Sequence, residues 1–129
     1  MRFIRRPLTS AWFAIPLLAI LPFGCGGQKP ADPDQARATL TLALDAWRDG
    51  RTLEEVNRDS PSITVADPSW KAGFKLSRYQ VAETTRAAGF DLQFPVELWL
   101  EDTKGKATQQ KVKYTVSIQP SRTVLRAPL

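Results

Sequence analysis

Residues 95–118 read PVELWLEDTKGKATQQKVKYTVSI and contain two alternating segments joined by a polar turn. Apolar side chains fall on every second position of each segment, which is typical of a β-strand with one buried face. They are Val96, Leu98 and Leu100 in the first segment, and Val112, Tyr114, Val116 and Ile118 in the second. The turn between them, residues 102–106, contains Gly105. The stretch therefore predicts an antiparallel β-hairpin that packs one face against a core.

A shorter alternating segment precedes the hairpin, and its pattern shifts partway along. Its apolar residues fall first on even and then on odd positions: Phe74 and Leu76, then Tyr79 and Val81. Such a shift predicts a β-bulge near Ser77 and Arg78. Pro95 has no amide hydrogen, so we expect it at the start of its strand or at an edge of the sheet. A last short strand is expected over residues 123–126.

An amphipathic helix of about 17 residues is predicted upstream of these strands. Asp32 can cap it, Pro33 suits its first turn, and Gln35 completes a capping box. Apolar residues then recur at helical spacing: Ala36, Leu40, Ala43, Leu44 and Trp47. We expect Trp47 in the core, and Gly50 ends the helix.

The chain between this helix and the strands predicts three short elements. Residues 52–55 form a second capping box, so a helix through Arg58 is expected. Residues 63–65 are a brief extended segment. Asp67 and Pro68 then open a tight turn in which the Asp67 carboxylate can cap backbone amides.

These elements predict an α+β fold for residues 32–129, as a single domain. One long N-terminal helix and a short helix would pack on a curved antiparallel sheet of about four strands. In order and size the chain resembles the cystatin-like or nuclear-transport-factor-2-like folds. It is also similar to uncharacterised small exported lipoproteins of bacteria, through the Trp-x-x-Gly pattern of residues 47–50, the Asp-Pro-x-Trp turn of residues 67–70 and the glycine-containing hairpin. These motifs are structural and carry no catalytic residues across.

Residues 1–24 are predicted to be a signal peptide. Arg2, Arg5 and Arg6 give it a basic start, and an apolar run from Leu8 to Phe23 follows. The part of that run over residues 11–23 holds about 13 residues, whereas a membrane span needs about 20. Three prolines would also interrupt a continuous helix: Pro7, Pro16 and Pro22.

The only cysteine, Cys25, follows this apolar core directly after Gly24. The arrangement resembles the site where bacterial lipoproteins are cut and lipidated, and the resemblance implies a lipid on Cys25. The segment departs from the usual box, because Pro22 and Phe23 stand where leucine and a small residue are common, and Leu21 lies one position early.

Three other fates of the N-terminus stay open. Ordinary cleavage near residues 24–27 would leave a secreted, unlipidated domain. An uncleaved segment would act as an anchor. The Arg5 and Arg6 pair also fits twin-arginine export, although nothing else in the segment does.

Residues 25–31 read CGGQKPA, a composition typical of a flexible tether. Fully extended at ~3.4 Å per residue, such a tether reaches only about 20 Å. With lipid on Cys25, the domain would lie close to the membrane of the cell envelope, on the periplasmic face or at the outer membrane.

The net charge argues against a nucleic-acid partner. Three of the 18 Lys and Arg residues belong to the predicted signal, so the remainder has 15 basic against 13 acidic residues, a net charge of +2. Basic residues are interleaved with acidic ones and form no electrostatic footprint along the sequence.

The residue types present restrict the possible chemistry. The chain has no histidine, and Cys25 is its only cysteine, so the usual neutral-pH base, thiolate catalysis and common transition-metal ligands are missing. No glycine-rich phosphate loop is present. We therefore predict no catalytic residues, no cofactor and no metal.

Three residues remain as formal candidates for an enzyme. In nuclear-transport-factor-2-like enzymes, a pocket between helix and sheet can hold an Asp base and a Tyr donor, which here would be Asp67, Tyr79 and Tyr114. Each also has a structural explanation, Asp67 as a cap and the tyrosines as core or rim residues. We do not predict an active site from them.

Trp99 marks a possible binding surface. It alternates with Leu98 and Leu100, so it should lie on the face opposite the core, between Glu97 and Glu101. An exposed tryptophan can mark a contact with a partner, and the alternative is packing under the turn that contains Trp70.

Two hypotheses for function follow. The preferred one is a non-enzymatic, membrane-tethered accessory or binding domain in the cell envelope, with a possible protein partner there. The alternative is a small-ligand enzyme that uses a pocket between helix and sheet.

Overall fold

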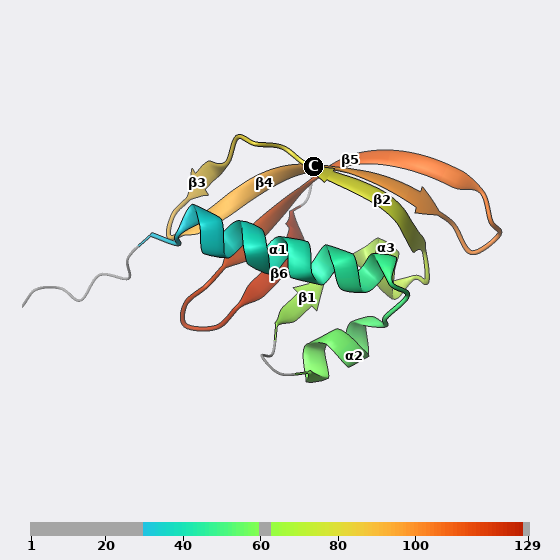
Figure 1. The fold of residues 1–129 in the computed structure, drawn as a ribbon, viewed down its shortest axis with the longest axis horizontal. Coiled ribbons are helices and arrows are strands. Elements are labelled where there is room, and N and C mark those ends of the chain that lie inside the picture. Colours follow the sequence, from blue (N-terminus) through green and yellow to red (C-terminus); the bar gives the residue numbers. More distant parts are fainter. Residues whose placement is uncertain (1–29, 60–62, 128–129) are drawn as a thin grey trace, which may run out of the picture.

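The computed structural model describes residues 30–59 and 63–127 of the 129-residue chain. Within these described residues, three helices and six strands follow one another in the order shown in Figure 1. The helices are α1 (Pro33–Arg48), α2 (Leu53–Arg58) and α3 (Pro68–Lys71). The strands are β1 (Thr64–Ala66), β2 (Lys75–Val81), β3 (Arg86–Ala88), β4 (Asp91–Glu101), β5 (Ala107–Ser117) and β6 (Thr123–Ala127).

Helix α1 forms where the capping and apolar pattern predicts it. The Asp32 carboxylate accepts a hydrogen bond from the Asp34 amide at 2.9 Å, and Pro33 occupies the first turn. The helix has 16 residues, and its apolar stripe is buried. Gly50, just beyond its end, has φ of +86°, a conformation that favours glycine.

The sheet is larger than predicted and is mixed rather than purely antiparallel. Its strand order is β1-β6-β5-β4-β2, and β3 pairs with β4 outside this path. β1 pairs with β6 in parallel, and every other pair is antiparallel. The prediction of about four antiparallel strands is therefore wrong. The two additional strands, β1 and β3, have three residues each, too few for an alternating pattern to identify them.

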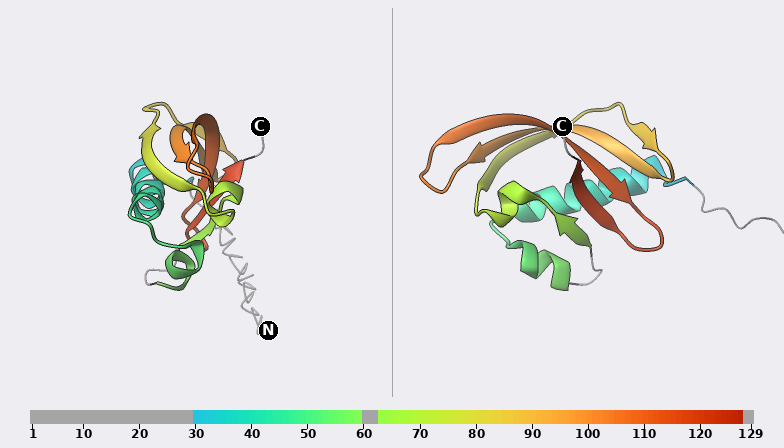
Figure 2. Two further views of the ribbon diagram at one scale, coloured as in Figure 1. Left: turned by 90° about the vertical axis from the view of Figure 1, so that its right-hand side faces the viewer. Right: turned by 180° about the vertical axis from the view of Figure 1, so that it is seen from behind.

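The sheet curves over α1, which packs against β2, β4, β5 and β6 (Figure 2). The predicted hairpin is confirmed as β4 and β5, with Val96 opposite Val112. The predicted bulge is also confirmed, because the register of β2 shifts between Leu76 and Arg78. One core lies between α1 and the concave face of the sheet, and it includes Trp47, which is 3% exposed.

Pro95 lies inside β4, which begins at Asp91, so the first of its two predicted positions, the start of the strand, is wrong. The second, an edge position, holds locally, because neither β2 nor β3 pairs with β4 at Pro95. Its position has a local explanation. The Pro95 carbonyl accepts a hydrogen bond from the Ala82 amide at 2.9 Å. The Pro95 nitrogen, which carries no hydrogen, points to that same side of β4. There β2 has ended at Val81 and β3 has not yet begun, and no ladder hydrogen bond is lost.

The predicted signal and Cys25 lie outside the described residues. The described part of the predicted tether is bonded to the turn between β3 and β4, because the Ala31 amide donates to the Phe90 carbonyl at 3.0 Å. Within residues 30–59 and 63–127, no helix is long and apolar enough to cross a membrane.

Candidate functional site

The structure brings two of the three candidate residues together. Asp67 follows β1 and is 3% exposed. One of its oxygens accepts from the amides of Ser69 at 2.9 Å and Trp70 at 3.2 Å, which confirms the predicted cap. The hydroxyl of Tyr114 on β5 donates to the other oxygen. Both oxygens of the carboxylate are thus engaged in holding α3 against the sheet.

Arg126 on β6 completes this cluster, and sequence reasoning missed it. Its Nη1 lies 3.5 Å from Asp67 Oδ1 and donates to Ser69 Oγ at 2.7 Å, while its Nη2 donates to Gln110 Oε1 at 3.1 Å. The inward direction of Arg126 could have been predicted from the alternation of β6, because Arg126 lies two positions after the buried Val124. We call Asp67, Ser69, Tyr114 and Arg126 the buried polar cluster.

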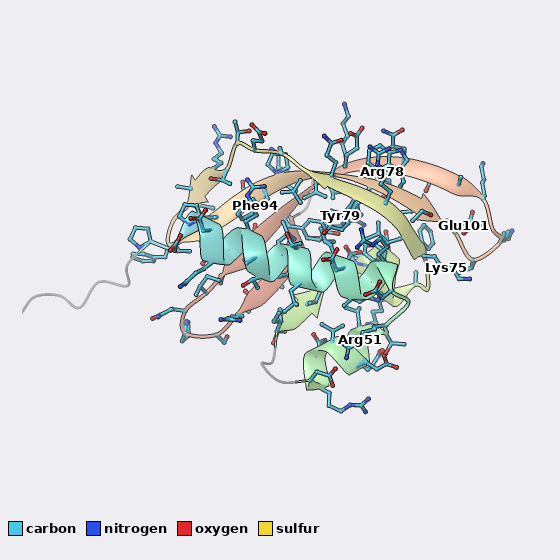
Figure 3. All side chains as sticks on the ribbon, viewed as in Figure 1. Arg51, Lys75, Arg78, Tyr79, Phe94 and Glu101 are labelled. Carbon is cyan, nitrogen blue, oxygen red and sulfur yellow. The ribbon has the colours of Figure 1, made fainter. Side chains whose placement is uncertain are left out.

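Tyr79 lies elsewhere and takes no part in the hydrogen bonds of the buried polar cluster. Its hydroxyl donates to Asp45 Oδ1 on α1 at 2.6 Å, and the Arg48 guanidinium lies 5.6 Å from the centroid of its ring. Figure 3 shows Tyr79 between β2 and α1. Burial, followed by the hydrogen bond to Asp45, raises the pKa of Tyr79 to about 12. This bond joins helix to sheet rather than preparing a reacting group.

Alkaline pH should weaken the domain through Tyr114. Burial raises the pKa of its hydroxyl well above the usual value, and the charge of Asp67 raises it further. Between the unfolded pKa of about 10 and the higher folded pKa, only the folded state keeps the proton, so the free energy of unfolding falls by up to about 1.4 kcal/mol per pH unit. Below pH 10 this contribution is fully present.

The Tyr114→Phe variant should therefore show a flatter decline above pH 10 than the unmodified protein. Urea denaturation at a series of pH values from neutral to alkaline measures this. Tyr79→Phe is the comparison, because the pKa of Tyr79 is raised only to about 12. It should flatten the decline between about pH 10 and 12 but not beyond, whereas Tyr114→Phe should also flatten it at higher pH. Parallel pH profiles for Tyr114→Phe and the unmodified protein would contradict the prediction.

A separate pocket of about 480 Å³ opens where α1 ends and β2 begins. Its inner wall includes Trp47 and Trp70, whose rings stack with centroids 5.2 Å apart and an interplanar angle of 4°. Their indole nitrogens donate to backbone carbonyls, Trp47 to Phe74 at 2.8 Å and Trp70 to Arg51 at 2.9 Å. The two rings therefore form a fixed apolar wall, of which only a small part is exposed, because Trp47 is 3% and Trp70 is 6% exposed.

Charged side chains surround this apolar wall at the surface. Both signs are present among the lining residues, which include Arg48, Arg51, Glu54, Lys71, Lys75 and Glu101. Figure 3 shows Lys75 and Glu101 at the same end of the sheet, where they are register partners on β2 and β4. None of the three candidate catalytic residues lines this pocket.

Trp99 lies on the outer face of the sheet, opposite the direction of Leu98 and Leu100, as the alternation indicates. It is only partly exposed, because the Arg78 guanidinium lies 4.4 Å from the centroid of its ring. Figure 3 shows Arg78 on this outer side. Its use as a binding surface stays a prediction.

Within the described part of the chain, no group of three or more His, Cys, Asp or Glu residues could hold a metal ion. No protein-family model matches the sequence, and neither a curated protein nor a solved structure matches it. The resemblance to cystatin-like and nuclear-transport-factor-2-like folds therefore stays a prediction.

Proposed function

We propose that this chain is a non-enzymatic binding domain, tethered to a membrane of the bacterial cell envelope by lipid on Cys25. The tether part is supported by the sequence, in which a basic and apolar signal ends at the lone cysteine Cys25, which is followed by GGQKPA. The first described helix begins at Pro33, so little chain separates Cys25 from the domain.

The binding part is carried by one observation, the pocket of about 480 Å³ at the end of α1. Its size falls in the usual range for small-molecule sites, which is roughly 300–1,000 Å³. The apolar wall with a charged rim suits a small amphipathic molecule, with a ring or chain against Trp47 and Trp70 and a polar group at the rim.

The non-enzymatic part is supported by where the candidate residues lie. Asp67 and Tyr114 bond to each other and Tyr79 bonds to Asp45, and none of the three lines this pocket. General acid–base chemistry needs a group within hydrogen-bond reach of a bound substrate. An enzyme built on these three residues therefore has less support than a binding domain.

Mass spectrometry of the mature N-terminus tests the tether. We expect a chain that begins at Cys25 and carries acyl groups, found in the membrane fraction. The Cys25→Ala variant should move to the soluble fraction after signal processing. A processed Cys25→Ala protein that stayed quantitatively in the membrane would refute the lipid tether.

A pocket-filling variant tests the binding part. The fluorescent amphiphile 1-anilinonaphthalene-8-sulfonate is titrated against the protein. Ser77→Trp should fill the pocket from its exposed side and lower the affinity about tenfold, a change of about 1.4 kcal/mol. Ser117→Trp, at the far end of β5, is the matched control and should bind like the unmodified protein. Equal affinities for both variants would contradict the proposal.

A further inference from the structure

The outer face of the sheet carries four basic residues that the proposed binding pocket does not use. Arg78, Arg86, Lys111 and Lys113 are exposed and come from β2, β3 and β5. We call these four the outer basic face. Among the described residues, none of them forms an ion pair within 4.0 Å, since the four ion pairs found there all involve other basic residues.

Two shallow hollows show that three of these side chains share one surface. The first, about 290 Å³, is lined by Arg86 and Lys113 together with Gln93 and Pro95. The second, about 260 Å³, is lined by Lys111, Glu97 and Pro95. Pro95 belongs to both hollows, so Arg86, Lys111 and Lys113 lie along one strip. Arg78 lines neither hollow and lies farther along the same face, where it is the register partner of Trp99.

The acidic residues of this face come from β4 and from the connection between β2 and β3. Glu97 is the register partner of Lys111 but accepts a hydrogen bond from Gln109 instead of forming an ion pair. Glu83 lies nearby in the connection between β2 and β3, where it is exposed. Glu101 and Asp91 lie on the same outer side of β4, at its two ends. Basic and acidic residues therefore alternate along this face, and Arg86, Lys111 and Lys113 give its middle part a local excess of positive charge.

Charge is also divided between the two halves of the domain. Residues 32–59, which include α1 and α2, contain seven acidic and four basic residues, a net charge of −3. Residues 75–127, which form most of the sheet, contain nine basic and five acidic residues, a net charge of +4. Such a division orients a molecule in the field of a charged surface, with the sheet toward negative charge.

The tether enters the domain beside the outer basic face. Ala31 bonds to the carbonyl of Phe90 in the turn that joins β3 to β4, next to the strand that carries Arg86. The Phe90 side chain is 53% exposed at this point. A tether of about 20 Å therefore brings this end of the face to the surface that holds the lipid.

We propose that the outer basic face docks on anionic phospholipid headgroups of the membrane that carries the tether, an inference that rests on the lipidation in the proposed function. Lys and Arg side chains near an anionic leaflet are attracted to it within a Debye length, about 8 Å at physiological ionic strength. The tether supplies a high local concentration, so a weak attraction is enough to orient the domain. Trp99, partly exposed beside Arg78, suits the headgroup region, where tryptophan is enriched.

Lysine labelling of the lipidated protein in vesicles tests this orientation. The protein is reconstituted in phosphatidylcholine alone or mixed with phosphatidylglycerol, then acetylated briefly and analysed by mass spectrometry. Lys111 and Lys113 should react several-fold more slowly in the anionic vesicles. The protection should disappear at about 0.5 M NaCl, where the Debye length falls to about 4 Å. Lys71 on α3 is the internal control and should react equally in both.

Paired charge variants separate a specific face from general positive charge. Lys111→Gln/Lys113→Gln should abolish the slower exchange of backbone amides in β5 that anionic vesicles produce, as measured by hydrogen exchange. Lys104→Gln/Lys106→Gln removes the same charge from the β4–β5 turn and should retain it. Equal labelling of Lys111 and Lys113 in the two vesicle types, or equal effects of the two variant pairs, would overturn the proposal.

Two further outcomes distinguish a failure of the lipid tether from a failure of the assignment of phospholipid as the binding partner. If the mature protein proves unlipidated, it is added to phosphatidylglycerol vesicles and sedimented. Salt-sensitive binding that only the Lys111→Gln/Lys113→Gln variant loses would then support the docking face without the tether. Protection in native membranes but not in phosphatidylglycerol vesicles would overturn the lipid assignment and indicate an acidic protein partner.

Discussion

Replacing Asp67 by alanine is expected to lower the free energy of unfolding by about 3–5 kcal/mol, the cost of removing one partner of a buried ion pair. The carboxylate caps α3 through two amides, accepts from Tyr114 and faces Arg126. Without it, the Arg126 guanidinium would stay largely buried without its counter-charge, because its side chain is only 13% exposed. Equilibrium urea denaturation measures the loss.

The matched control for this variant is Asp102→Ala. Asp102 also accepts two backbone amides, those of Lys104 at 2.9 Å and Lys106 at 2.8 Å, but at an exposed turn. Asp102→Ala should lower the free energy of unfolding by about 0.5–2 kcal/mol, as is usual for the loss of a surface cap. A loss at Asp67 no larger than the loss at Asp102 would show that the buried polar cluster contributes little to stability.

A double-mutant cycle can isolate the bond between Asp67 and Tyr114. Asp67→Asn, Tyr114→Phe and the double variant are compared in the same denaturation experiment. Because the two side chains are in direct contact, we expect their effects to be non-additive by about 0.5–3 kcal/mol. Additive effects would mean that the bond has no stabilising role of its own.

Replacing Trp47 by alanine should destabilise the domain by about 3–5 kcal/mol, as is usual for a large core aromatic. The ring is buried, stacks on Trp70 and anchors the start of β2 through its bond to the Phe74 carbonyl. The loss should be visible as a lower midpoint in chemical denaturation. The Trp47→Ala substitution should also abolish the binding of 1-anilinonaphthalene-8-sulfonate at the pocket, because Trp47 forms part of its inner wall.

Trp99→Ala is the same substitution on the opposite face of the sheet, and it serves as the control. Its ring is partly exposed and contacts Arg78, so the cost should be below about 1 kcal/mol. Equal losses for the two variants would mean that Trp99 has a structural role comparable to that of Trp47. Its proposed place at the membrane surface would then lose support.

The sequence predicted the elements that local chemistry determines. The cap at Asp32, the stripe that ends at Trp47 and the alternation of the hairpin each depend on neighbouring residues, and all three are confirmed. The register shift of β2 near Ser77 is also confirmed. It could be predicted from neighbouring residues because a bulge moves every later side chain to the other face of the sheet.

The features that sequence reasoning missed depend on contacts between distant segments. β1 is a strand because it pairs with β6, and β3 is a strand because it pairs with β4. Neither has enough residues to show a period. Pro95 is tolerated inside β4 only because its neighbour on that side has left the sheet.

The buried polar cluster was predicted in part. Asp67 before Pro68 indicated a cap, but its pairing with Tyr114, 47 residues away, has no local signature. The position of Arg126 could have been inferred from its parity with Val124, although the identity of its partners could not. The outer basic face could not be predicted from the sequence, because its four residues lie on three strands, β2, β3 and β5, that are distant along the chain.

The parallel pairing of β1 with β6 has a consequence for when the domain can fold. β6 lies between β1 and β5, so the last strand of the chain is an interior strand of the sheet. A chain that has not yet released residues 123–127 can form the hairpin and α1, but it leaves β1 and the polar cluster without their partner. Proteins whose contacts join distant segments fold slowly. Under the proposed export from the N-terminus, the sheet would therefore stay unfinished until residues 123–127 had crossed the membrane.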